Sequence, residues 1–149
     1  HLGYPGAYRE GLAAVKATIT EMREKNVIAY LWEVGERLRA GLSRLISDYG
    51  MQKYVECVGL PPRTFMVFHD IGNTPALIAK SLFQQEIIKR GVLSIGVHLV
   101  SFSHTTDDIE YTLGIYQEAL DILAKAADEG NIEQKLEGSP ISPVLRPVT

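Results

Sequence analysis

A long apolar stripe near the C-terminus constrains the fold of this chain most strongly. Apolar residues recur there at alternating steps of four and three: Ile109, Leu113, Tyr116, Leu120, Leu123 and Ala127. This spacing places them on one face of an α-helix. Thr105 and Asp108 match a capping box, and Gly130 suits a left-handed helix end. The pattern predicts a helix behind Thr105 that covers a core, because it is too short for a sustained coiled coil.

Three further segments have helical spacing. Residues 7–24 carry a stripe of Leu12, Val15, Ile19 and Met22. Residues 27–49 carry a stripe of Ile28, Leu31, Val34 or Gly35, Leu38, Leu42 and Leu45, followed by Gly50 as a helix end. The third segment begins with Thr74 as N-cap and Pro75 as the first helical residue, and it ends before Gly91. We expect Gly35 to mark a close helix contact and Gly41 to be merely tolerated.

Short apolar runs between these helices predict strands over residues 54–60, 64–70, 92–95 and 97–103. The second run has Phe65 and Val67 on one side and Met66 and Phe68 on the other, which predicts a strand covered on both faces. Strands joined by short turns and flanked by helices indicate an α+β fold. We therefore expect two layers, a small, mostly antiparallel sheet with helices packed on it.

Composition excludes several classes of protein. The net charge of −3 argues against a nucleic-acid partner, because phosphate binding needs a basic face. No apolar run approaches the roughly 20 residues that span a bilayer. Cys57 is the one cysteine, so no internal disulfide is expected, and a reduced, cytoplasmic location is the simplest interpretation. Its alternating apolar neighbours favour a buried strand cysteine over a reactive thiol.

No complete catalytic or metal constellation is visible. His98 and His104 flank a predicted strand, but two histidines lack a third ligand unless Asp107 contributes, so no metal is expected. Ser101 and Ser103 lie near His104, yet no Gly-x-Ser-x-Gly elbow accompanies them. Glycine-rich phosphate motifs are absent as well. The residues alone therefore indicate a stable domain without a defined reaction.

The order of several short motifs resembles class III pyridoxal-phosphate aminotransferases, in the branch similar to glutamate-semialdehyde aminomutase. The most specific is Ser101-Phe102-Ser103-His104-Thr105, followed by Asp107-Asp108-Ile109 and Thr112-Leu113. The other matching stretches are Gly3-Tyr4-Pro5, Gly11 to Val15, Asn26-Val27-Ile28, Leu31-Trp32, Gly35 to Leu38, Gly41-Leu42, Gly59 to Arg63, Gln85-Glu86, Arg90 to Leu93, Glu137-Gly138 and Pro143 to Arg146.

The resemblance implies that this chain is the C-terminal domain of a longer enzyme. Residues 1–24 would form a phosphate-side turn and an interdomain helix, residues 25–138 the small domain and residues 139–149 an extended tail. A chain that opens without methionine inside a Gly/Pro turn fits this expectation. None of the seven lysines matches the family's Schiff-base lysine motif, so we expect the fragment alone to be inactive.

The resemblance also implies partners and site residues. Gly3 and Pro5 map onto a turn that faces the pyridoxal phosphate of the partner subunit, although Tyr4 replaces the family's asparagine. The expected partners are an upstream cofactor-binding domain, a second subunit and a small amino substrate. Arg63, His98, Ser101 and His104 are the polar residues expected at the substrate pocket, with Arg63 a chemical choice for a carboxylate. The alternative is a stand-alone binding or interaction module, which would have a self-contained surface.

Overall fold

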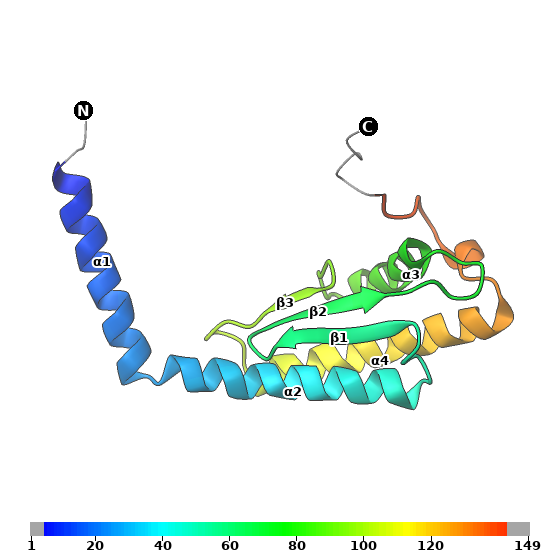
Figure 1. The fold of residues 1–149 in the computed structure, drawn as a ribbon, viewed down its shortest axis with the longest axis horizontal. Helices are drawn as coiled ribbons and strands as arrows, with labels where there is room; N and C mark the ends of the chain where they lie inside the picture. The colour runs from blue at the N-terminus through cyan, green and yellow to red at the C-terminus, as the bar shows by residue number, and fades with distance from the viewer. Residues whose placement is uncertain (1–4, 143–149) are drawn as a thin grey trace.

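The computed structural model describes residues 5–142, with side chains described from residue 9 onward. The elements follow the order α1 (Pro5–Glu24), α2 (Val27–Asp48), β1 (Val55–Leu60), β2 (Arg63–Phe68), α3 (Ala76–Lys89), β3 (Val97–Leu99), α4 (Thr106–Glu129) and the 3-10 turn η1 (Glu133–Lys135). The three strands form one antiparallel sheet in the order β1-β2-β3, with α2 and α4 side by side beneath it (Figure 1). The predicted α+β class is confirmed.

The third strand is shorter than the sequence suggested, and the strand expected over residues 92–95 is wrong. Only Val97–Leu99 pairs with β2, and the segment before it is irregular. Leu93 and Ile95 are 86% and 65% exposed, so residues 5–142 do not bury these two apolar side chains. Gly96 has a positive φ of 89°, and its carbonyl accepts a hydrogen bond from the Met66 N–H. The chain therefore turns into β3 through a glycine instead of extending along the sheet.

One face of the sheet is covered and the other is open. The covered face and helices α2, α3 and α4 share a core whose fully buried members include Leu42, Val55, Leu82, Ile87, Tyr116, Leu120 and Leu123. Residues of β2 alternate between this core and the open side, because successive side chains in a strand point to opposite faces. The expectation that β2 is covered on both faces is therefore not met by the described residues.

The ends of α4 follow the sequence signals. The Thr105 side chain accepts from the Asp108 N–H, and the Asp108 side chain accepts from the Thr105 N–H, which completes the predicted capping box. Gly130 ends the helix with a φ of 67°. The corresponding prediction for α3 is wrong. Its N-cap position is Pro75, without a side-chain cap, and Asp70 Oδ1 accepts from the Ala76 N–H at 2.8 Å. An Ile71–Thr74 bridge folds the chain so that Asp70 reaches the helix start.

Two glycines let α2 approach its neighbours closely. A Cβ added to Gly35 would lie 2.1 Å from the Pro61 carbonyl oxygen, so this position packs α2 against the β1–β2 turn. The close helix contact occurs instead at Gly41, where an added Cβ would lie 2.4 Å from a Leu113 methyl group of α4. The expected helix contact at Gly35 is therefore replaced by a turn contact, and Gly41 has a packing role.

Helix α1 projects away from the rest of the domain (Figure 1). Leu12 and Ile19 of its apolar stripe are 69% and 46% exposed. The same surface continues onto the start of α2, where Ile28 and Trp32 are exposed, so Ile28 does not join the buried stripe as expected. In proteins, most of the stability of such a helix comes from packing of its apolar face against other elements. The exposed stripe therefore indicates a surface suited to burial by further polypeptide.

We predict that Gly35→Ala destabilises the domain whereas Gly114→Ala does not. At Gly35 the new methyl group meets main-chain atoms of the turn, and such overpacking costs about 1–3 kcal/mol. At Gly114 no atom lies within 4 Å of the added Cβ, so the higher helix propensity of alanine should stabilise by about 1 kcal/mol. Urea unfolding followed by circular dichroism measures both changes. Equal effects of the two substitutions would contradict the close approach of α2 to the turn.

Candidate functional site

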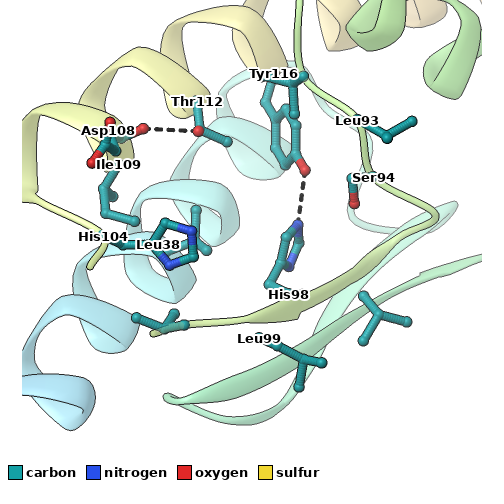
Figure 2. Close-up of a pocket in the computed structure, with 13 residues that line it drawn as sticks. Leu38, Leu93, Ser94, His98, Leu99, His104, Asp108, Ile109, Thr112 and Tyr116 are labelled. Atoms are coloured by element: carbon teal, nitrogen blue, oxygen red, sulfur yellow. Dashed lines mark hydrogen bonds between the residues drawn. The ribbon is translucent and has the colours of Figure 1, made fainter. Parts of the chain in front are cut away.

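A buried histidine lies between the sheet and α4. Strand pairing sets His98 directly opposite Thr64, and His98 Nδ1 lies 2.9 Å from Thr64 Oγ1. On the other side of the ring, Nε2 lies 2.9 Å from the Tyr116 hydroxyl oxygen, which α4 supplies (Figure 2). Only 8% of His98 is exposed. Both ring nitrogens are therefore satisfied inside the domain, as buried polar groups require.

This network carries no charge at neutral pH. Burial lowers the pKa of His98 to about 4, because desolvation disfavours the imidazolium form. Burial likewise raises the pKa of the Tyr116 hydroxyl, which stays protonated. Burial also raises the pKa of the Cys57 thiol, which is partly buried beside Thr64. Cys57 is therefore a weak nucleophile, in agreement with the prediction of a strand cysteine that packs rather than reacts.

The loop after β3 holds the second histidine in a fixed orientation. The Ser101 N–H donates to His104 Nδ1 at 2.9 Å, and Ser101 Oγ lies 3.2 Å from the same nitrogen. Tyr30 of α2 fixes the loop by donating to the His104 carbonyl oxygen at 2.7 Å and by an edge contact with Phe102. Because Nδ1 accepts the backbone N–H, the proton of the neutral ring lies on Nε2.

The carboxylate next to this loop is part of the helix cap. Asp108 Oδ2 lies 2.7 Å from the Thr105 N and 2.7 Å from Thr105 Oγ1, and both groups donate to it. The backbone hydrogen bond from Thr105 is the main reason that the pKa of Asp108 is lowered, and the Thr105 hydroxyl adds to it. Asp108 is exposed and ionised, and its role in the structure is to start α4.

His98 and His104 line one cavity of about 220 Å³ between β3 and α4. His104 and Asp108 lie on one side of it, and His98, Tyr116 and Ser94 lie on the other (Figure 2). The remaining lining residues are Leu38, Val92, Leu93, Val97, Leu99, Val100, Ile109 and Thr112. The cavity is thus mostly apolar, with polar groups at a few places, a common composition for a small-molecule site.

The structure brings together three of the four predicted pocket residues. His98 and His104 line the cavity, and Ser101 bonds to His104. Arg63 does not line it. It lies on the open face of the sheet, opposite Leu99 in the register, with its guanidinium 5.1 Å from the centre of the Phe65 ring. An assignment of all four residues to the substrate therefore stays a prediction. Gly3 lies outside the described residues, and Pro5 is the first residue of α1.

Sequence reasoning missed Thr64, Tyr116 and Tyr30 as parts of this site. Tyr116 was recognised only as a member of the α4 stripe, and its hydroxyl needed a buried partner. Thr64 would have been found from the strand register, which sets it opposite His98. Nothing in the sequence near Tyr30 signalled its bond to a residue 74 positions away.

The open face of the sheet is a mostly apolar surface that also carries one arginine and one glutamate. It carries Glu56, Val58, Leu60, Arg63, Phe65, Val67, Val97 and Leu99, which the register places on one side. Leu60 and Leu99 are more than half exposed. Isolated apolar residues at a surface are ordinary, but a contiguous set on neighbouring strands indicates an interaction surface.

The described residues offer no metal or membrane site. Within residues 5–142, no group of three histidine, cysteine or acidic side chains could hold a metal ion. Among the same residues, no helix is both long enough and apolar enough to cross a bilayer.

Comparisons with known proteins connect this fold to one group of enzymes. No protein-family model matches the sequence. The chain is 29% identical over 130 residues to glutamate-1-semialdehyde 2,1-aminomutase of Thermus thermophilus, a match that covers 79% of this chain and 29% of that protein.

Two solved structures share the fold. One is the FumI protein of Sphingopyxis sp. MTA144 in its PLP internal aldimine form, with a TM-score of 0.65 and 24% identity over 76% of this chain and 27% of that chain. The other is a transaminase with PLP bound, with a TM-score of 0.59 and 16% identity over 66% of this chain and 24% of that chain. The match thus spans less than a third of the length of each of the three proteins.

We predict that His98 makes the stability of the domain depend on pH. The pKa of His98 is about 4 in the folded state and about 6.5 when exposed, so the unfolded chain binds more protons between these values. The free energy of unfolding therefore keeps its full contribution from the neutral His98 ring above about pH 6.5. It falls by about 3 kcal/mol as the pH is lowered towards 4.

The test is urea unfolding of the wild type and His98→Gln from pH 7 to pH 4. The free-energy difference between the two proteins should shift by about 3 kcal/mol in favour of the variant as the pH falls. His69→Gln removes an exposed histidine that pairs with Glu56 and serves as the control. Parallel pH curves for the wild type and His98→Gln would contradict a neutral buried ring.

Proposed function

We propose that this chain, a class III pyridoxal-phosphate aminotransferase-like domain, forms the C-terminal part of a larger enzyme that transfers an amino group on an amino acid or an amino-aldehyde. The similarity to a glutamate-1-semialdehyde 2,1-aminomutase along 79% of the chain carries this proposal. In the proposed enzyme, an upstream domain would bind pyridoxal phosphate, which supplies the electron sink for reactions at the α-carbon. The enzyme would be cytoplasmic and a homodimer.

The described residues do not fit the cofactor themselves. Within residues 5–142, no lysine or arginine lines the 220 Å³ cavity, so no described cation there could hold a phosphate group. All seven lysines lie within the described residues, and six of them are exposed. Four of these are in ion pairs: Lys25, Lys89, Lys125 and Lys135. A Schiff-base lysine needs a desolvated or electropositive site that lowers its pKa, and acidic partners have the opposite effect. We therefore assign the reactive lysine to polypeptide outside this chain.

The open surfaces support a domain that packs on more polypeptide. No segment among residues 5–142 covers the apolar face of the sheet or the stripe of α1. A stand-alone binding module, the alternative function, would be expected to bury such faces or to make them polar. We propose that the upstream domain covers the open sheet face and that α1 connects the two domains. Gly3 and Pro5 would then approach the cofactor phosphate of the partner subunit, as the family resemblance implies.

Arg63 is the predicted substrate residue that faces the proposed upstream domain. Its guanidinium lies on the open sheet face, and the neighbouring Phe65 ring holds it by a cation–π contact. A planar guanidinium can bind a carboxylate through two hydrogen bonds. His98 and Ser101 would act indirectly, His98 by keeping β3 on α4 and Ser101 by orienting His104.

We predict that the chain forms no specific imine with pyridoxal phosphate. After borohydride reduction and proteolysis, mass spectrometry should find low, scattered modification over the exposed lysines, because none is desolvated beside a cation. Stoichiometric labelling of one lysine would contradict the assignment of the reactive lysine to missing polypeptide. The reductant without cofactor is the control.

We also predict that the α1 stripe makes the isolated chain self-associate. Leu12→Glu combined with Ile19→Glu should lower the average mass measured by analytical ultracentrifugation, because charge replaces the exposed apolar surface. Ala14→Glu combined with Ala17→Glu alters the opposite face of the helix and should leave the mass unchanged. A monomeric wild type, or equal effects of the two pairs, would contradict an orphaned interface on α1.

A further inference from the structure

The cavity beside His98 has the size of a small organic ligand. Its volume is about 220 Å³, and Leu38 of α2 contributes to its wall together with β3 and α4 (Figure 2). For comparison, an apolar cavity of about 150 Å³ in another protein binds benzene. The space therefore suits one ring or branched chain with a short substituent.

One hydrogen-bond donor in the cavity wall, on the exposed side chain of His104, has no protein partner among residues 5–142. The Ser101 N–H donates to His104 Nδ1, which leaves the ring proton on Nε2. Within residues 5–142, every hydrogen bond of the His104 side chain is made by Nδ1. Tyr30 holds the backbone of this loop on α2, so the position of the ring is set by the fold. A ligand that accepts a hydrogen bond would satisfy His104 Nε2.

The charges around the cavity disfavour anionic ligands, because the lining carboxylate of Asp108 is ionised. Among the part of the chain that the structure describes, neither lysine nor arginine lines the cavity, so an anion would find no counter-charge there. Asp108 uses Oδ2 to accept from Thr105, and His98 is neutral because burial lowers its pKa to about 4. His98 Nε2 and the Tyr116 hydroxyl form a hydrogen bond with each other. The remaining surface is apolar, which favours an uncharged molecule.

We propose that this cavity binds a small uncharged carbonyl compound with an apolar body, and that His104 Nε2 donates to its carbonyl oxygen. The apolar body would lie against Leu38, Ile109 and Val97. This inference goes beyond the proposed amino-transfer function, because it needs no residue outside this chain. A chain that fails to belong to a pyridoxal-phosphate enzyme would still contain this site.

Calorimetric titration of the 149-residue chain with acetophenone tests the proposal, with ethylbenzene as the probe that lacks a carbonyl and benzoate as the charged probe. Acetophenone should bind saturably at one site and about fivefold more tightly than ethylbenzene, the difference that one hydrogen bond of about 1 kcal/mol provides. His104→Phe keeps a ring of similar size and should reduce this preference to none. Benzoate should not bind.

Two variants on α4 locate the site. Thr112→Phe fills the cavity and should abolish binding, whereas Gln117→Phe makes the same change at an exposed position and should leave binding unchanged. Circular dichroism and thermal unfolding confirm that each variant is folded. The proposal is overturned by the absence of saturable acetophenone binding, by binding that persists in folded Thr112→Phe, or by an unchanged preference in His104→Phe.

Discussion

A three-stranded sheet has two faces, and the described part of this chain covers only one of them. Helices α2, α3 and α4 bury the inner face, mostly in one large core. The outer face keeps apolar side chains on all three strands, together with Arg63. Burial of apolar area is the main favourable term in folding and association, so an uncovered sheet of this kind is a strong constraint on what the domain does. The proposal that it is one part of a larger enzyme depends on this asymmetry.

The covered side owes its specificity to polar groups as well as to apolar packing. His98, Thr64 and Tyr116 link β2, β3 and α4 by two hydrogen bonds. Leaving one of these buried groups without a partner would cost about 1–3 kcal/mol, so the network fixes β3 against α4. The same arrangement forms one wall of the cavity, while the loop fixed by Tyr30 forms the other. Fold stability and the candidate ligand site therefore depend on the same residues.

Patterns local in sequence predicted the fold well. The capping box at Thr105 and the glycine Gly130 correctly predicted the two ends of α4. The apolar stripe between them contained the core residues Tyr116 and Leu120. The prediction failed where a distant segment decides the outcome. Residues 92–95 are apolar without a strand partner, and Asp70 replaces Thr74 at the start of α3 because an intervening turn brings it there.

The candidate site was only partly predictable for the same reason. His98, Ser101 and His104 were recognisable as polar residues close in sequence. Strand alternation and register decide that these three lie at the cavity whereas Arg63 lies on the open face of the sheet. The partners Thr64 and Tyr30 come from other elements and carry no local signal.

The most direct test of the central claim is a purification of the natural polypeptide that contains this sequence, followed by its intact mass and its cofactor content. The account predicts a polypeptide several times longer than this chain that releases one equivalent of pyridoxal phosphate per subunit on denaturation. A natural product of the size of this chain, folded with its sheet face exposed and without the cofactor, would contradict it.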